Sequence, residues 1–146
     1  MSLREELIAL LGNWSGTEQL TPLDGPVTTA RAMLVAKLDV ADRVVLMDYR
    51  QVAAGGAEYS GHGVFTEDRD SPDICWWFFD STGSAPTTAR GRRSGNGLVL
   101  VADGDQRIEH RFAVDGDELS YAILVSDNNQ AAVSILNGRY RRISGH

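Results

Sequence analysis

Two histidines and two aspartates carry the side chains that could perform acid–base chemistry in this sequence. His110 alternates with apolar residues over 108–114, so a strand there would place its imidazole on the apolar face. His62 stands between two glycines, which would allow a ligand or another backbone to approach closely. Asp48 and Asp80 interrupt apolar runs, where a carboxylate needs a partner or a shifted pKa. An interior histidine with Asp48 or Asp80 would form an acid–base pair; a core histidine and turn-capping aspartates are the structural alternatives.

Aromatic residues supply the other candidate contacts for a ligand. Tyrosines offer hydroxyl groups to the polar end of a ligand, and the run 74–79 is almost entirely apolar and aromatic. Such runs also form ordinary hydrophobic core, and that interpretation stays open. The predicted ligand-binding residues are Tyr49, Tyr59, His62, Trp77, Phe79, Asp80, His110 and Tyr121.

The composition predicts one acidic domain that folds without covalent or metal cross-links. The chain has 146 residues, with 20 acidic and 14 basic side chains and a formal net charge of −6. A chain of this length buries roughly 70% of its unfolded surface. Its single cysteine cannot form an internal disulfide, and no cysteine–histidine cluster has zinc-site spacing, so we expect no metal. The acidic balance argues against a nucleic-acid partner.

The first residues predict a short amphipathic helix over 2–11. Ser2 and Glu5 have the spacing of a capping box, leucines follow at helical intervals, and Gly12 ends the pattern. The segment lacks the features of a signal peptide. No apolar stretch approaches the roughly 20 residues that span a bilayer. We therefore expect a cytoplasmic protein with no membrane partner.

Ten runs rich in β-branched and aromatic residues follow this helix, separated by Gly, Asp, Asn or Pro. Asp-Gly and Asn-Gly pairs supply the positive φ of tight hairpins, and short hairpins require antiparallel strands. The sequence therefore predicts one all-β domain over 1–146, an up-and-down antiparallel β-barrel over 13–143. The expected strands are 13–21, 27–39, 43–52, 57–66, 73–81, 86–94, 97–102, 106–114, 118–126 and 130–143.

Two strand patterns bear on what the barrel does. Ala30, Ala32 and Ala36 alternate along one face, and an inward row of small residues leaves room for a ligand. Close packing against a neighbouring element is the alternative. The strand 73–81 is apolar on both faces, so its outer face needs a cover, such as the helix or a second subunit. A homodimer is therefore a possible assembly.

The segment 12–14 (Gly-Asn-Trp) and the arginine-rich segment 138–142 resemble the calycin superfamily of lipocalins and fatty-acid-binding proteins. In that superfamily a tryptophan closes the base of the barrel and an arginine from the last strand packs over it. The resemblance therefore implies that Trp14 closes this barrel together with Arg139 or Arg141, with a guanidinium stacked on the indole.

A closer resemblance extends over nearly the whole chain. The segments Asp48-Tyr49, Tyr59–Gly63 and Trp77–Gly83 are similar to a bacterial calycin-like family called domain of unknown function 1579. That resemblance implies a ten-stranded barrel and no established ligand.

Two ligand-binding calycin groups differ from this sequence. Fatty-acid-binding proteins hold a carboxylate with an Arg-x-Tyr pair, whereas here Arg139 directly precedes Tyr140 and the two point to opposite faces. The haem-binding nitrobindins use a histidine late in the chain, for which His110 is the interior candidate here. Haem through His110 is therefore an alternative to the expected absence of a cofactor.

We expect a protein that binds a small, largely apolar molecule inside the barrel. Two alternatives stay open. One is a small isomerase or hydrolase that uses an interior histidine with Asp48 or Asp80. The other is a ligand-free dimeric interaction protein. Binding is favoured over catalysis. The sequence contains no phosphate loop, dinucleotide fingerprint or nucleophile elbow, but an acid–base site can assemble from distant strands without such a motif.

Overall fold

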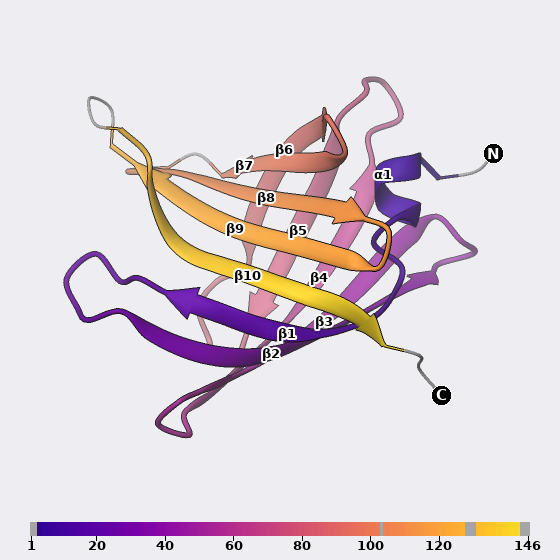
Figure 1. Cartoon of the computed structure of the whole chain (residues 1–146). Helices are drawn as coiled ribbons and strands as arrows, with labels where there is room; N and C mark the ends of the chain where they lie inside the picture. The colour runs from indigo at the N-terminus through magenta and orange to yellow at the C-terminus, as the bar shows by residue number, and fades with distance from the viewer. Residues whose placement is uncertain (1–2, 103, 128–130, 144–146) are drawn as a thin grey trace.

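The computed structural model describes residues 3–102, 104–127 and 131–143. Each strand pairs antiparallel with the next, and β1 pairs with β10 to close the barrel (Figure 1). This arrangement confirms the predicted ten-stranded antiparallel barrel. The elements are α1 (Glu5–Ile8), β1 (Gly12–Leu20), β2 (Thr28–Asp39), β3 (Val44–Ala53), β4 (Glu58–Glu67), β5 (Ile74–Asp80), β6 (Thr87–Ser94), β7 (Gly97–Ala102), β8 (Arg107–Asp115), β9 (Glu118–Ser126) and β10 (Val133–Ile143).

Strand alternation decides which side chains fill the barrel. On β2, Ala30, Ala32 and Ala36 are buried, whereas Met33 and Val35 between them are exposed. The alanine row therefore faces inward, as the sequence pattern predicted. Because side chains alternate between the two faces of a strand, the same rule fixes the inward set on every other strand.

The N-terminal helix is shorter than predicted. It runs only from Glu5 to Ile8, with Arg4 at its N-cap, and Ser2 of the predicted capping box lies outside the described residues. After the helix the chain forms a tighter turn, in which the amide of Leu11 donates to the carbonyl of Ile8, three residues earlier, at 3.1 Å. The carbonyl of Leu10 accepts from the Trp14 indole at 2.8 Å, so the last predicted turn serves as a cap on the barrel. Within the described residues, no helix is long and apolar enough to cross a membrane.

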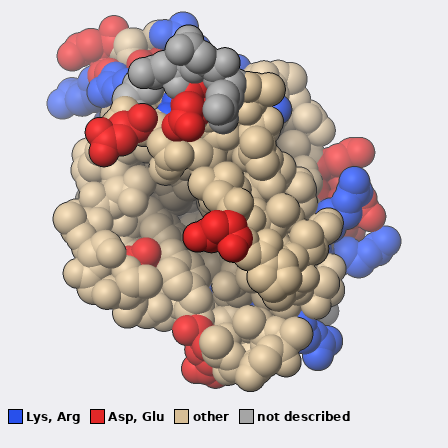
Figure 2. All heavy atoms as spheres, turned by 90° about the vertical axis from the view of Figure 1, so that its left-hand side faces the viewer, with Lys and Arg blue, Asp and Glu red and all other residues tan. Residues whose placement is uncertain are grey.

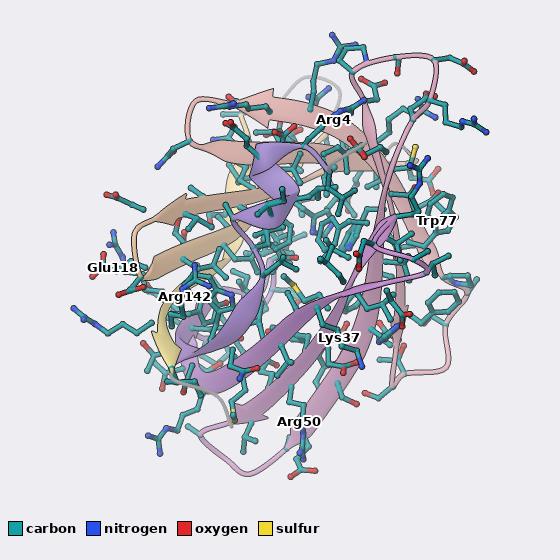
Figure 3. All side chains as sticks on the ribbon, turned by 90° about the vertical axis from the view of Figure 1, so that its right-hand side faces the viewer. Arg4, Lys37, Arg50, Trp77, Glu118 and Arg142 are labelled. Atoms are coloured by element: carbon teal, nitrogen blue, oxygen red, sulfur yellow. The ribbon has the colours of Figure 1, made fainter. Side chains whose placement is uncertain are left out.

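Trp14 and Arg142 close the barrel at the end where α1 lies, and Figure 3 faces this end and labels Arg142. The Trp14 ring is fully buried, and the Arg142 guanidinium stacks 4.2 Å from its centroid. Arg142 also donates to the backbone carbonyls of Leu11 and Ala9. The expectation that Arg139 or Arg141 fills this role is wrong, because both lie at exposed positions of β10. Arg142 shares the inward phase of Tyr140, two residues earlier.

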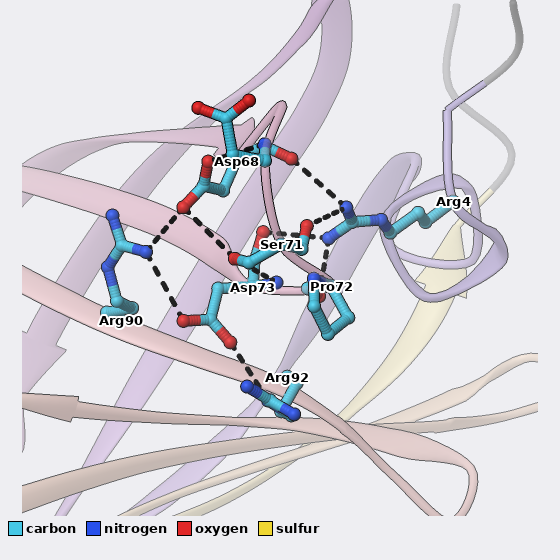
Figure 4. A network of polar contacts seen from close by, with 8 residues as sticks. Arg4, Asp68, Ser71, Pro72, Asp73, Arg90 and Arg92 are labelled. Carbon is cyan, nitrogen blue, oxygen red and sulfur yellow. Dashed lines mark hydrogen bonds and ion pairs between the residues drawn. The ribbon is translucent and has the colours of Figure 1, made fainter.

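Arg4 fastens the N-terminal segment to the turn between β4 and β5 (Figure 4). Its guanidinium donates to four backbone carbonyls between residues 68 and 73 and pairs with Glu67 at 3.1 Å. The same turn is held from the other side, where Arg90 contacts Asp68 at 2.6 Å. Local hydrogen bonds, led by the amide of Asp70, and Arg90 lower the pKa of Asp68 to about 2. The turn therefore stays anionic, and it anchors the segment that leads into α1.

Candidate functional site

A cavity of about 380 Å³ occupies the barrel and opens at the end opposite α1. Figure 2 faces this end and shows a hollow between the strand-connecting loops. The cavity is mainly apolar and aromatic, with a few polar groups. Its lining residues are Leu34, Met47, Tyr49, Gln51, Tyr59, Gly63, Trp76, Phe78, Asp80, Thr87, Ile108, His110, Phe112, Tyr121, Ile123, Ile135 and Leu136.

Five of the eight predicted ligand-binding residues lie in this lining. They are Tyr49, Tyr59, Asp80, His110 and Tyr121. The structure therefore brings these five together around one space.

The expected inward positions of Trp77 and Phe79 are wrong. Both side chains point outward, with 38% and 49% of their surface exposed (Figure 3 shows Trp77). Trp76 and Phe78 line the cavity instead. The run 74–79 is apolar on both faces, so its own pattern did not reveal which set faces inward. The sequence of β4 could have revealed the inward face of β5, because two glycines on the inward face of β4 leave room for large neighbouring rings.

Gly61 and Gly63 form sockets for the two aromatic rings of β5. A Cβ atom at Gly61 would lie 2.0 Å from Cζ of Phe78, and one at Gly63 would lie 2.7 Å from Nε1 of Trp76. The rings therefore lie directly against the backbone of β4, and the cavity begins beyond them. Within the described part of the chain, the buried Trp76 Nε1 has no hydrogen-bond partner.

His62 lies on the outside of the barrel, which corrects its expected place in the ligand site. The two flanking glycines take the inward phase and leave His62 outward, where its Nδ1 lies 2.6 Å from Oδ1 of Asp48. Both side chains are about half exposed. Asp48 therefore forms no pair with an interior histidine, contrary to that version of the acid–base hypothesis.

His110 faces the interior as expected, with only 7% of its surface exposed. Its Nδ1 lies 2.8 Å from the Tyr121 hydroxyl, and its ring centroid is 4.6 Å from that of Trp76. Burial lowers the pKa of His110 from its ordinary value of 6.5 to about 4, because the charged imidazolium would be poorly solvated there. The imidazole is therefore neutral at pH 7, and its partner is a phenol rather than a carboxylate.

Glu18 is the main polar residue that sequence reasoning missed. It is 2% exposed and accepts hydrogen bonds from the Tyr49 hydroxyl at 2.6 Å, the Gln51 amide at 2.8 Å and the Tyr140 hydroxyl. Burial, followed by the charge of Glu18, raises the pKa values of Tyr49 and Tyr140, so both phenols keep their protons. The available signal was its spacing from Trp14, since an inward residue 14 places residue 18 on the same face.

Asp80 marks the mouth of the cavity. Its Oδ2 accepts from the Tyr59 hydroxyl at 3.0 Å, and its Oδ1 accepts from the Thr82 hydroxyl at 2.6 Å. The Thr82 hydroxyl is the largest cause that holds the pKa of Asp80 below its ordinary value, so this carboxylate is ionised at neutral pH. Burial and the bond to Asp80 raise the pKa of Tyr59, which therefore stays a hydrogen-bond donor to Asp80.

Comparisons with known proteins identify the fold. No family model matches the chain, so membership of domain of unknown function 1579 is not confirmed, and no curated protein matches it. One similar solved structure is Rv2717c from M. tuberculosis, with 17% identity, a TM-score of 0.73, and coverage of 98% of this chain and 100% of that one.

Two further solved structures have the same architecture. The S-type phycobiliprotein lyase CPES from Guillardia theta has 12% identity and a TM-score of 0.73, covering 100% of this chain and 95% of that one. A de novo designed fluorescence-activating beta barrel has 14% identity and a TM-score of 0.52, covering 97% and 100%. At these identities the likeness concerns the fold alone. The chain is a closed ten-stranded antiparallel barrel, consistent with the calycin-like architecture expected from its sequence.

Proposed function

We propose that this protein binds a small, largely apolar molecule inside its barrel. The observation that carries the proposal is the cavity of about 380 Å³, which is open at one end and lined by aromatic and aliphatic side chains. Small-molecule sites in proteins typically have volumes of about 300–1,000 Å³ and few polar groups. The names of two structural neighbours, a phycobiliprotein lyase and a fluorescence-activating barrel, also favour a small molecule without specifying it.

Filling the cavity tests this proposal. Ile123 lines the cavity on β9, whereas its neighbour Leu124 has the outward phase. Ile123→Trp should weaken binding of uncharged naphthylethanol at least tenfold, whereas Leu124→Trp should bind it as the unmodified protein does. Titration calorimetry measures the affinities, and circular dichroism confirms that each variant is folded.

A second cavity-filling variant tests the same site in case Ile123→Trp does not fold. Ile135→Phe adds volume at another position of the lining and should also weaken the probe. Equal affinity in all variants, or no binding to the unmodified protein, would contradict an interior site.

Native mass spectrometry of freshly purified protein would identify a ligand retained from the cell. An absorption spectrum of the same sample tests haem. The contact of His110 Nδ1 with Tyr121 would leave Nε2 as the iron ligand, but the ring packs against Trp76 with centroids 4.6 Å apart, and we do not include haem in the proposal. Among the described lining residues, no lysine or arginine is placed to meet the haem propionates. We therefore expect no Soret band.

The homodimer stays a prediction that the same preparation can test. α1 lies at the end of the barrel and leaves Trp77 and Phe79 exposed on the outer face of β5. Light scattering would give the oligomeric state, and a monomeric mass would count against a dimer through this face.

A further inference from the structure

We propose that the ligand of this cavity is a cationic amphiphile, a molecule with an ammonium or amidinium group on an aromatic or aliphatic body. This inference rests on the proposed function and specifies its ligand class. The positive group lies at the mouth, near Asp80, Tyr59 and Gln51, and the apolar body lies deeper, against Trp76 and Phe112.

The hydrogen bonds of the lining leave acceptors facing the cavity. The Tyr59 proton goes to Asp80, so the Tyr59 oxygen keeps an acceptor site free, whereas the Tyr49 hydroxyl donates to Glu18 and already accepts from Gln51. The Gln51 amide nitrogen donates to both Glu18 and Tyr49, which uses its two hydrogens and leaves its carbonyl oxygen as an acceptor. The acceptors on Tyr59 and Gln51 favour a ligand that donates hydrogen bonds, whereas the unpartnered Trp76 Nε1 lies against the backbone of β4 at Gly63.

The charges of the lining also favour a cationic ligand. Asp80 is a carboxylate at the mouth, and Glu18 is a second acidic residue directly behind Tyr49 and Gln51. Of the described residues that line the cavity, none is a lysine or arginine, and buried His110 is neutral. A ligand carboxylate would be buried here without a cation, which is costly. A ligand cation would meet a carboxylate of opposite charge.

Aromatic rings near the mouth provide a second means of holding a cation. Tyr49 and Tyr59 form an edge-to-face pair with centroids 6.0 Å apart, and Phe78 lines the same cavity. A cation over such ring faces is attracted by their electron-rich surfaces, and the attraction is larger where water is excluded.

The acidic residues around the open end of the barrel should attract a cation. Loops and strand ends at the open end carry the exposed acidic residues Asp24, Glu58, Asp105 and Asp127. In Figure 2, carboxylates stand beside the hollow, whereas most basic side chains lie toward the edge of the view. Arg107, at the start of β8, is paired with Glu109 at 3.1 Å. An excess of one sign of charge around a cleft raises the local concentration of oppositely charged ligands.

Three naphthalene probes with the same ring system test the charge preference. Titration calorimetry should rank naphthylethylammonium at least tenfold tighter than naphthylacetate, with uncharged naphthylethanol between them. Asp80→Asn should reduce the preference for the cation over naphthylethanol to less than threefold. Asp115→Asn removes the same charge at the opposite end of the barrel and should leave the preference unchanged.

Two outcomes would overturn the inference in distinguishable ways. If naphthylacetate binds as tightly as the ammonium probe while all probes respond to Ile123→Trp, the cationic ligand is wrong and interior binding stands. If none of the three probes binds, the proposed function fails with it.

Discussion

The two ends of the barrel are built from the same strands but differ in how far their polar groups and apolar surface are satisfied within the chain. At the α1 end, arginine donors meet backbone carbonyls and Trp14 fills the opening, so polar groups and apolar surface are both satisfied within the chain. At the other end, Tyr59 donates to Asp80 and Gln51 donates to Glu18, and acceptors of these groups remain toward a hollow. Together with the proposed function, the difference assigns stability mainly to one end and ligand recognition to the other.

Removing the closing tryptophan should have the largest effect on stability. Trp14→Ala deletes a fully buried ring, its bond to Leu10 and the surface on which Arg142 stacks, so we expect a loss of ~3–5 kcal/mol. Urea denaturation at pH 7 measures this free energy. Trp77→Ala, on the outer face, should cost no more than about 1 kcal/mol. Similar losses in the two variants would mean that the α1 end is not the stabilising one.

Acidification should destabilise the protein through His110, in the interior between the two ends. Its folded pKa is about 4 and its ordinary value is 6.5. The unfolded chain therefore binds the proton more readily, and stability should fall as the pH drops from 6.5 to about 4. The full contribution is present above pH 6.5 and amounts to roughly 3 kcal/mol at most.

Urea denaturation at several pH values from 7 to 4.5 measures this decline. His110→Gln should flatten it, whereas His62→Gln, which removes an imidazole from the outer face, should keep it. A decline of the same size in His110→Gln would assign the acid sensitivity to other groups.

Arg142→Met separates the charge of the closing arginine from its bulk. The methionine keeps an apolar chain over Trp14 but loses the cation–π contact and the bonds to the carbonyls of Leu11 and Ala9. We expect a loss of ~1–2 kcal/mol in urea denaturation, with unchanged affinity for naphthylethanol. A large change in affinity would show that the two ends are coupled.

Tyr59→Phe is the corresponding change at the open end and should have the smallest effect on stability. It removes a hydroxyl that donates to the solvent-accessible Asp80, so we expect a loss below about 1 kcal/mol. Because it also removes an acceptor at the mouth, affinity for naphthylethylammonium should fall about threefold to tenfold in calorimetry. A stability loss larger than that of Arg142→Met would reverse the comparison between the two ends.

The sequence predicts the barrel well because strand alternation and hairpin turns are local signals. The inward alanines of β2 and the interior position of His110 follow from that alternation. The phase of β5 does not, because Trp76, Trp77, Phe78 and Phe79 are apolar on both faces and only the sockets of β4 select two of them. Glu18 was missed because its three donors come from β3 and β10, and such a network is invisible in one strand.

The sockets at Gly61 and Gly63 have an evolutionary consequence. A methyl group at either position would push Phe78 or Trp76 away from the backbone of β4 and toward the barrel centre, because the rings already touch that backbone. The size of the proposed ligand could therefore change through single codons at these glycines, while the acidic and acceptor groups at the mouth kept the proposed preference for a cation. The volume and the polarity of this barrel are two traits that selection can adjust independently.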